Sequence, residues 1–330
     1  MAIIPTHRPR RNRKSQVIRD LVQETTLSVH DFIYPIFLIE GQNQAVEVKS
    51  MPGIYRFSPD RIIDEIGQCV DLGIKSFAPF PGLEDGVKDR LARESANPNG
   101  LYLRTVAEIK RHFPEVVLMT DVAMDPYSSD GHDGVVDPES GEILNDATLE
   151  VLGQMALAQA RAGADVIAPS DMMDGRVAFI RDVLDSNGFS NVSIMSYTAK
   201  YASAFYGPFR DALDSAPKRG DKKTYQMNPA NRREALRELA LDEQEGADIV
   251  MVKPALSYLD VIREVRNNTT LPVTAYNVSG EYALVKAAAL NGWVDGEKTM
   301  MEVLMSIKRA GADAILTYFA KEAAAVLKRG

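Results

Sequence analysis

Two lysines stand where apolar runs end, and they are the residues of this sequence best suited to covalent chemistry. Lys200 follows the apolar run 192–199, and Lys253 follows the run 248–252. Such runs are typical of buried β-strands, so each ammonium group is expected in a partly dehydrated place. Burial lowers a lysine pKa, and a second cation nearby lowers it further. A neutral amine can attack a ketone and form a Schiff base, whereas a surface lysine after a strand is the ordinary interpretation of either residue alone.

The composition is that of a globular enzyme rather than a nucleic-acid-binding or membrane protein. The net charge of -8 over 330 residues argues against nucleic acid as the main partner. Cys69 is the only cysteine, so a disulfide within the chain and a thiolate zinc cluster are both excluded. No apolar run is long enough to cross a bilayer, and no apolar stretch that would mark a secretory signal follows the first basic residues. We therefore expect a cytoplasmic protein that binds neither nucleic acid nor membrane.

A basic cluster interrupted by prolines marks the start of the chain. Nucleic-acid contact is one interpretation, and a mitochondrial presequence is another, although the prolines would spoil its amphipathic helix. We favour an extended arm over residues 1–30 that packs on a neighbouring subunit. The residues concerned are Pro5, Arg8, Pro9, Arg10, Arg11, Arg13 and Lys14.

The tripeptide Gly-Ala-Asp recurs along the chain, each time between a helical pattern and an apolar run. It occurs at residues 163–165, 246–248 and 311–313. Glycine supplies the left-handed residue that commonly ends a helix, and the turn that follows leads into a strand. The repeat therefore indicates a succession of helix–turn–strand units.

Eight strand-like runs alternate with helical patterns such as residues 149–162 and 232–246, and this alternation predicts an α/β protein. Over residues 31–330 it favours a (β/α)8 TIM barrel as the catalytic domain, carrying the extended N-terminal arm. A doubly wound sheet is the alternative, but it would usually carry a glycine-rich turn after its first strand, and residues 38–43 form no such turn. The strand-like runs are residues 32–37, 75–80, 116–122, 165–169, 192–197, 248–252, 272–277 and 314–318.

A barrel places its catalytic residues at the carboxyl ends of its strands, so side chains far apart in the sequence are expected to meet there. Every strand from the third to the eighth is followed by a polar or ionisable residue. They are Asp121, Asp125, Asp171, Asp174, Lys200, Lys253, Ser279 and Tyr318.

Two long stretches between elements carry further polar chemistry. Residues 121–134 contain several aspartates and glycines, which could hold a hard cation such as magnesium or could simply form a solvated turn. Residues 200–226 are too long for a simple connector and suggest an active-site lid. Within them Arg210, Lys222 and Gln226 could clamp a carboxylate, although a solvated basic loop is the plainer interpretation.

Several of these stretches together resemble the porphobilinogen synthase family, also called δ-aminolevulinic acid dehydratase. The likeness runs from the basic arm to the last strand and includes the aspartate-rich loop. The motifs that carry it are Ser-Tyr-Thr-Ala-Lys-Tyr-Ala at 196–202, Phe-Tyr-Gly-Pro-Phe-Arg-Asp at 205–211, Tyr-Gln-Met-Asn-Pro at 225–229, Met-Val-Lys-Pro at 251–254 and Tyr-Asn-Val-Ser-Gly-Glu at 276–281.

The resemblance implies a reaction in which two molecules of 5-aminolevulinate condense, with loss of two waters, to porphobilinogen for tetrapyrrole synthesis. Lys253 matches the lysine that binds the first, P-side substrate as a Schiff base, and Lys200 matches its A-side counterpart. Ser279 and Tyr318 match ligands of the P-side carboxylate. The resemblance also implies a barrel whose N-terminal arm embraces a neighbour, commonly in a homo-octamer.

On the A side, the resemblance assigns the second substrate's carboxylate to Arg210, Lys222 and Gln226. Zinc-dependent members of the family carry three cysteines in the third-strand loop, and none is present here. The corresponding residues are Ala123, Asp125 and Asp133.

Thiolates select zinc, whereas carboxylates and water select magnesium, so we expect no active-site zinc. Asp125 and Asp133 either ligate an ion or organise water and the substrate amine, and Asp121 belongs to the same active-site loop. Glu238 matches a carboxylate that holds a hydrated, allosteric magnesium ion in magnesium-stimulated relatives. Without the family, Glu238 would be read as a solvent-facing helix residue.

A class I aldolase is the nearest rival function, because it also forms a Schiff base in a barrel but needs only one reactive lysine. A non-catalytic barrel that binds a ligand or assembles through its arm is a further alternative. Dependence of activity on both Lys200 and Lys253 would favour the dehydratase, and a non-catalytic barrel would form no borohydride-trapped adduct with a keto acid.

Overall fold

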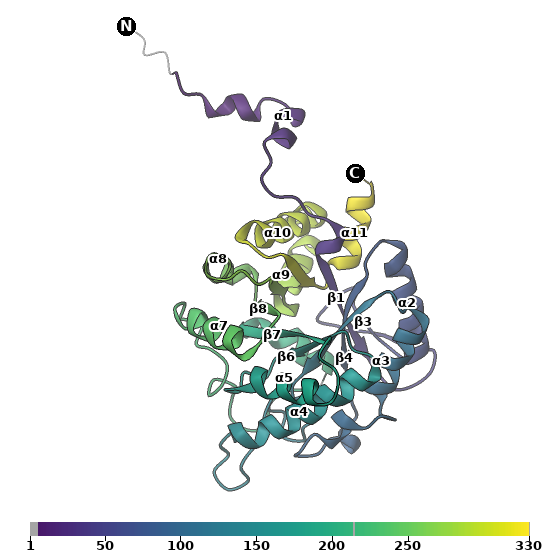
Figure 1. The fold of residues 1–330 in the computed structure, drawn as a ribbon. Helices are drawn as coiled ribbons and strands as arrows, with labels where there is room; N and C mark the ends of the chain where they lie inside the picture. Colours follow the sequence, from purple (N-terminus) through teal and green to yellow (C-terminus); the bar gives the residue numbers. More distant parts are fainter. Residues whose placement is uncertain (1–5, 214, 330) are drawn as a thin grey trace.

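A computed structural model, which describes residues 6–213 and 215–329, shows a closed barrel of parallel strands surrounded by helices (Figure 1). Barrel strands lie side by side in chain order, and the last pairs with the first through Phe32 and Ile315, which closes the barrel. The predicted (β/α)8 fold is therefore confirmed. The barrel strands are β1 (Phe32–Leu38), β4 (Ser76–Pro81), β5 (Val117–Val122), β6 (Val166–Pro169), β7 (Ser193–Lys200), β8 (Ile249–Lys253), β9 (Val273–Asn277) and β10 (Ala314–Thr317).

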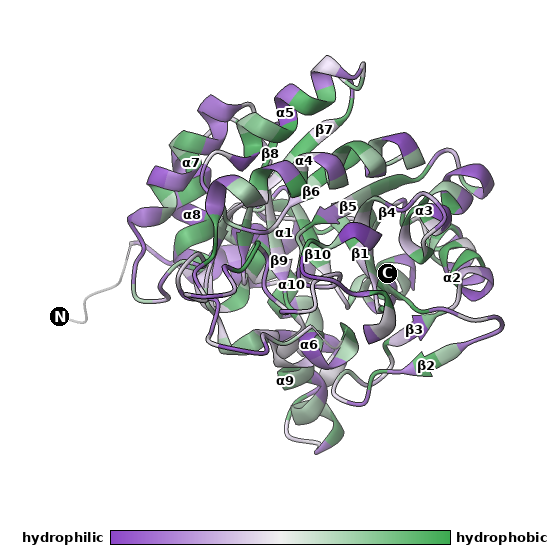
Figure 2. Cartoon of the chain, turned by 90° about the horizontal axis from the view of Figure 1, so that it is seen from below, coloured by the Kyte–Doolittle hydropathy of each residue, from purple (hydrophilic) through white to green (hydrophobic). Residues whose placement is uncertain are grey.

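The helices cover the outside of the barrel, so the strands are buried on both faces, as in β1 and β9, where every residue is buried. Figure 2 shows hydrophilic and hydrophobic residues alternating along helices such as α5 and α7, as expected for elements with one face on the core. The helices that follow the barrel strands are α2 (Pro59–Asp71), α3 (Leu101–His112), α4 (Asn145–Ala162), α5 (Arg176–Ser186), α7 (Glu234–Glu245), α8 (Leu259–Asn268), α9 (Ser279–Leu290), α10 (Gly296–Ala310) and α11 (Ala320–Arg329). No helix in the described part of the chain is long and apolar enough to cross a membrane.

The repeated Gly-Ala-Asp tripeptide ends helices, as predicted, and its aspartate has a second role. Gly163 and Gly246 adopt left-handed φ angles of 104° and 99° at the ends of α4 and α7. The aspartate two residues later accepts a hydrogen bond from a backbone N–H of the preceding barrel strand: Asp165 from Leu118 and Asp248 from Ile194, each at 2.8 Å. Each tripeptide therefore ends one helix and ties its strand to the neighbouring one.

The structure departs from the predicted elements in two ways. A short hairpin of β2 (Ala45–Glu47) and β3 (Tyr55–Phe57) was not predicted, and β3 pairs with the carboxyl end of β1. Three-residue strands are too short to show a period in the sequence. Strands β7 and β8 also extend to include Lys200 and Lys253, and Asp121 lies within β5. The prediction that Lys200 and Lys253 follow their strands was therefore wrong by three residues and by one residue, because each predicted run was ended at a polar or charged residue before the backbone pairing ended. Asp121 lies inside β5, as it does inside the predicted run 116–122.

Residues ahead of the barrel form an extended arm that points away from it (Figure 1). The arm contains η1 (Pro9–Arg13) and α1 (Gln16–Leu21), and η2 (Val29–Asp31) lies at its base, directly before β1. Val17 and Leu21 on α1 are exposed. The predicted arm over residues 1–30 includes residues 1–5, which lie outside the described residues. Its role in subunit assembly remains a prediction.

Candidate active site

The two lysines singled out in the sequence are the last residues of neighbouring strands. In the parallel pairing of β7 with β8, Lys200 stands directly beside Lys253. Both side chains are buried, with 5% and 7% of their surface exposed. Neighbouring strands that end in register bring two amines to the same end of the barrel, as the sequence predicted.

Lys253 sits in an aromatic environment. Its Nζ lies 4.7 Å from the ring centre of Tyr276, 5.1 Å from Tyr197 and 5.4 Å from Phe209. No carboxylate in the described part of the chain forms an ion pair with it. Burial, together with the charge of Lys200, lowers the pKa of Lys253 to about 7. A substantial fraction of this amine is therefore neutral near neutral pH, which is the form that attacks a carbonyl carbon.

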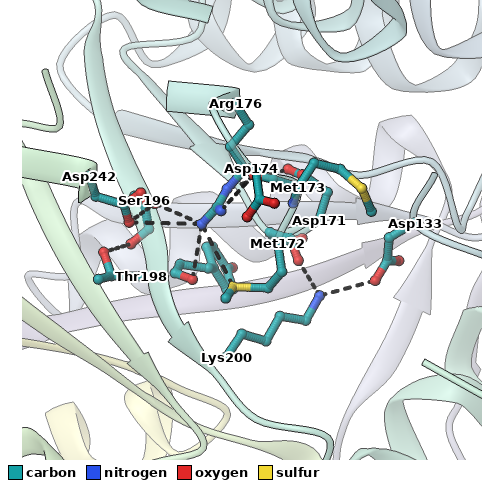
Figure 3. Close-up of polar contacts among 12 residues, drawn as sticks. Asp133, Asp171, Met172, Met173, Asp174, Arg176, Ser196, Thr198, Lys200 and Asp242 are labelled. Atoms are coloured by element: carbon teal, nitrogen blue, oxygen red, sulfur yellow. Dashed lines mark hydrogen bonds and ion pairs between the residues drawn. The ribbon is translucent and has the colours of Figure 1, made fainter. Parts of the chain in front are cut away.

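Lys200 differs from Lys253 because its amine is paired. It donates to the carbonyl oxygen of Ser170, at the end of β6, and lies 3.4 Å from Asp133 Oδ2. Figure 3 shows the Lys200 side chain pointing toward Asp133. The two amines are thus adjacent but held in different surroundings, one aromatic and one acidic.

Asp133 also contacts a third lysine from the lid segment, which we define as residues 201–213 and 215–226. Lys222 Nζ lies 2.8 Å from Asp133 Oδ1 and 3.1 Å from Asp125 Oδ2. Although burial opposes ionisation, Lys200 and Lys222 hold the pKa of Asp133 well below its usual range. Burial raises the pKa of Asp121 to about 6 against the opposing effect of the lysines. One aspartate is therefore held ionised between two ammonium groups, while another can exchange a proton near neutral pH.

The lid segment closes over Lys253. Phe209, in α6 (Gly207–Leu213), faces Lys253, and its backbone N–H donates to Ser279 Oγ at 3.0 Å. Ser279 Oγ in turn donates to the carbonyl oxygen of Phe205 at 3.3 Å. The Tyr318 hydroxyl lies 2.9 Å from that of Tyr276, which places it beside the same aromatic group. Ser279 and Tyr318 therefore lie on the Lys253 side of the site, as the sequence predicted.

The other predicted carboxylate ligands belong to the lid segment. Arg210 is half-buried on α6, whereas Gln226 is 4% exposed. The Gln226 side-chain oxygen has no hydrogen-bond partner among the described residues. An orphaned buried polar atom is costly, so this amide is suited to receiving a polar group of a bound molecule. Lys222 also lies at the active site, where its amine forms ion pairs with Asp125 and Asp133.

Glu238 lies on α7, away from the lysines, and lines two cavities of about 1090 and 1170 Å³. Burial, together with the negative charges of Asp242 and Asp174, raises its pKa to about 7 against the opposing effect of Arg176. Among residues 6–213 and 215–329, no group of three or more His, Cys, Asp or Glu side chains is arranged to hold a metal ion. A cation at Glu238 would thus have a single carboxylate ligand, with water completing its coordination.

The Delta-aminolevulinic acid dehydratase family matches residues 6–326. The chain belongs to this family. A chloroplastic delta-aminolevulinic acid dehydratase of Oryza sativa is 57% identical over 98% of this chain and 75% of its own length. The enzyme of Synechococcus elongatus is 54% identical over 98% of this chain and 99% of its own length.

A solved structure of the delta-aminolevulinic acid dehydratase from Toxoplasma gondii, in complex with the reaction product porphobilinogen, has the same fold. It superposes with a TM-score of 0.96 at 53% identity, over 98% of this chain and 92% of that one.

A buried arginine of this dehydratase-family chain was missed by the sequence analysis. Arg176, at the start of α5, donates to Ser196 Oγ and to the carbonyl oxygens of Tyr197 and Met173, and lies 3.8 Å from Asp242 (Figure 3). It supports the loop after β6 that carries the Ser170 carbonyl. Nothing in the sequence signals it, because an arginine at a helix start ordinarily faces solvent.

The aromatic group around Lys253 was missed for a similar reason. Its members come from β7, β9 and the lid segment, and only the closed barrel brings them together. Their only sequence signal is the aromatic residues within the motifs at 196–202, 205–211 and 276–281.

The pKa of Lys253 predicts how its reactivity depends on pH. We expect the rate of borohydride-trapped adduct formation between Lys253 and levulinate, a simple keto acid, to rise with pH and to level off above about 7, because only the neutral amine attacks. Substituting Lys200→Met removes a neighbouring positive charge, so the pKa of Lys253 should rise. The midpoint of the curve of adduct-formation rate against pH should then move to higher pH. Peptide mapping by mass spectrometry at each pH measures the adduct. A midpoint that is unchanged in Lys200→Met, or moves to lower pH, would contradict this electrostatic account.

Proposed function

We infer that this chain condenses two molecules of 5-aminolevulinate, with loss of two waters, to porphobilinogen in tetrapyrrole synthesis, as a hydro-lyase. The family match over nearly the whole chain establishes the activity. The observation that carries the chemistry is the adjacent pair of buried lysines, Lys200 and Lys253, in different surroundings. Two similar keto acids must be held in distinct orientations, and two unlike amines at one barrel end can do this.

On the P side, we assign Schiff-base formation with the first substrate to Lys253. Its neutral amine attacks the ketone carbon, the carbinolamine loses water, and the resulting iminium withdraws electrons from the adjacent carbon. The aromatic rings around Lys253 stabilise a cation without pairing it, so they accommodate the amine both before and after the reaction. Ser279 and Tyr318 offer hydroxyl groups for the carboxylate of this substrate, once Ser279 releases the backbone of Phe205 and Phe209.

On the A side, we assign the second substrate to Lys200, with its carboxylate on Arg210, Lys222 and Gln226. Support comes from the burial of Gln226 with an unpartnered amide oxygen and from the shared contact of Lys200 and Lys222 with Asp133. An ionised Asp133 stabilises positive charge on Lys200 or on an iminium formed there.

We assign proton transfer between the P-side and A-side substrates to Asp121 and Asp125. Burial raises the pKa of both carboxyls, and that of Asp121 reaches about 6. A carboxyl group that titrates near neutral pH can both accept and return a proton. We therefore assign these aspartates to acid–base chemistry rather than to metal binding.

We propose that the protein is of the magnesium-stimulated type, with a hydrated ion at Glu238. Magnesium keeps several waters and needs few protein carboxylates, which suits one half-buried glutamate between two cavities. The neighbouring Asp174 and Asp242 raise the pKa of Glu238, and a divalent cation would relieve that crowding of negative charge. Zinc in the active site is not part of the proposal, because the only cysteine, Cys69, is buried on α2.

We also propose that the arm assembles the chain into a homo-octamer in the cytoplasm. The exposed apolar side chains of Val17 and Leu21 on a segment that leaves the barrel support assembly.

The direct test of the function is porphobilinogen formation from 5-aminolevulinate by the purified protein. Substituting Lys253→Met or Lys200→Met should each lower kcat at least roughly a thousand-fold, because each removes an amine that forms a covalent intermediate. Lys298→Met is the matched control, since this lysine is exposed on α10 and forms its ion pair with Asp295 at the protein surface. Retained activity in Lys200→Met would contradict the two-amine mechanism and favour a single-lysine, aldolase-like reaction.

The magnesium proposal has its own test in chelator-treated protein. Adding magnesium should raise the rate of the parent chain by roughly five-fold or more, in the usual range of allosteric coupling, and zinc should not replace it. Substituting Glu238→Gln should remove the stimulation and leave the metal-free rate unchanged. Since the pKa of Glu238 is about 7 and the ion binds the carboxylate form, magnesium affinity should increase as pH rises through 7. Full stimulation of Glu238→Gln by magnesium would refute this site.

A further inference from the structure

The loop after β5 and the lid segment lie side by side along a continuous set of contacts, which we call the seam. The seam consists of residues 130–133 on the loop side and residues 216–225 on the lid side. Lys218 N donates to the carbonyl oxygen of Asp130 at 3.1 Å. Gly131 has a left-handed φ of 69°, and a Cβ there would collide with the Ala216 carbonyl. The backbones of the loop and the lid segment are therefore in direct contact, independently of their side chains.

His132 is the side chain that crosses the seam. It is 6% exposed, its Nε2 lies 2.8 Å from the carbonyl oxygen of Arg219, and its Nδ1 lies 3.1 Å from the Tyr225 hydroxyl. A carbonyl oxygen only accepts, so Nε2 carries the proton. In the tautomer with its proton on Nε2, the ring accepts a hydrogen bond at Nδ1 from the Tyr225 hydroxyl. Both ring nitrogens therefore form hydrogen bonds with the lid segment.

The Tyr225 hydroxyl completes the connection to the active site. It accepts a hydrogen bond from the backbone N–H of Asp133 at 3.3 Å while it donates to His132. Asp133 is the carboxylate that lies between Lys200 and Lys222. Tyr225 also belongs to the turn in which Gln226 N donates to the Lys222 carbonyl at 2.9 Å. One hydroxyl therefore fixes the backbone of Asp133 and the turn that carries Lys222 and Gln226.

We propose that His132 and Tyr225 are positioning residues for the A-side substrate. They contact neither reacting amine, and they act by holding Asp133, Lys222 and Gln226 in one arrangement when the lid segment is closed. On the P side, Ser279 and Lys253 meet the lid segment through residues 205–209, a different part of it. The inference rests on the proposed function, and it divides the lid segment into a P-side part and an A-side part.

The test uses Tyr225→Phe in the full-length protein. This substitution keeps the ring and removes the hydroxyl, which leaves the Asp133 N–H without its partner. KM for 5-aminolevulinate should rise roughly ten-fold, as expected for the loss of a hydrogen bond that leaves a donor unsatisfied. Borohydride trapping of the first substrate at Lys253 should proceed as in the parent chain, because Lys253 and Ser279 meet the lid segment at residues 205–209.

Two substitutions of His132 separate its two contacts. His132→Gln places an amide near the Nε2 position and keeps the Arg219 contact only, so its KM should resemble that of Tyr225→Phe. His132→Asn places an amide near the Nδ1 position and keeps the Tyr225 contact, so its KM should stay close to that of the parent. A role limited to folding would lower the thermal midpoint of all these variants without this difference in KM.

Limited proteolysis of the native protein provides a readout that does not depend on activity. Trypsin should cleave after Lys218, Arg219 or Lys223 several times faster in Tyr225→Phe and His132→Gln than in the parent. Tyr282→Phe is the matched control, because it removes a buried hydroxyl that donates to the Pro52 carbonyl, outside the seam, and should leave cleavage unchanged.

The outcomes distinguish the inference from the proposed function. Unchanged KM and unchanged cleavage in Tyr225→Phe would overturn the inference, and so would a loss of the Lys253 adduct together with the rise in KM. A parent chain that makes no porphobilinogen would instead overturn the proposed function. The proteolysis comparison would still decide whether His132 and Tyr225 hold the lid segment.

Discussion

The arrangement of the active site depends on burying two lysines side by side with only one of them paired to a carboxylate. A pKa of about 7 for Lys253, against an ordinary value of 10.5, corresponds to about 5 kcal/mol of destabilisation of the ammonium form relative to a lysine in water. Aromatic rings compensate only part of that cost, because a cation–π contact contributes about 1–2 kcal/mol. The unpaired amine is therefore destabilised as a cation, and this makes it a nucleophile near neutral pH.

The barrel and the lid segment both serve this arrangement. Strands β7 and β8 end in register, which brings Lys200 and Lys253 together on a rigid framework. Asp133 forms ion pairs with Lys200 and Lys222 but not with Lys253. The position of this one carboxylate therefore makes the electrostatic surroundings of Lys200 and Lys253 different. The lid segment adds Phe209 on one side and Lys222 on the other, and it excludes water from both amines. The position of this segment over the two amines thus contributes to the electrostatics as well as covering the site.

Much of this could be predicted from the sequence, because the signals were local. Apolar runs and the Gly-Ala-Asp tripeptide gave the barrel strands and the ends of the helices, and strand order then placed Lys200 beside Lys253. The hairpin of β2 and β3 was missed because three residues show no period. The role of Arg176 and the seam between His132 and Tyr225 were missed because they depend on contacts between residues about 20 and 93 positions apart. Whether a charged residue is buried depends on the closed fold, and the residue type alone does not reveal it.

The measurement that tests this account most directly is the site of attachment of a single substrate molecule. One equivalent of 5-aminolevulinate per chain, reduced with borohydride at pH 7 and mapped by mass spectrometry, should leave the adduct on Lys253 and leave Lys200 unmodified. That outcome follows from an amine that is partly neutral in one case and held by Asp133 and Ser170 in the other. An adduct found first or equally on Lys200 would contradict the claim that the aromatic surroundings of Lys253 make it the first nucleophile.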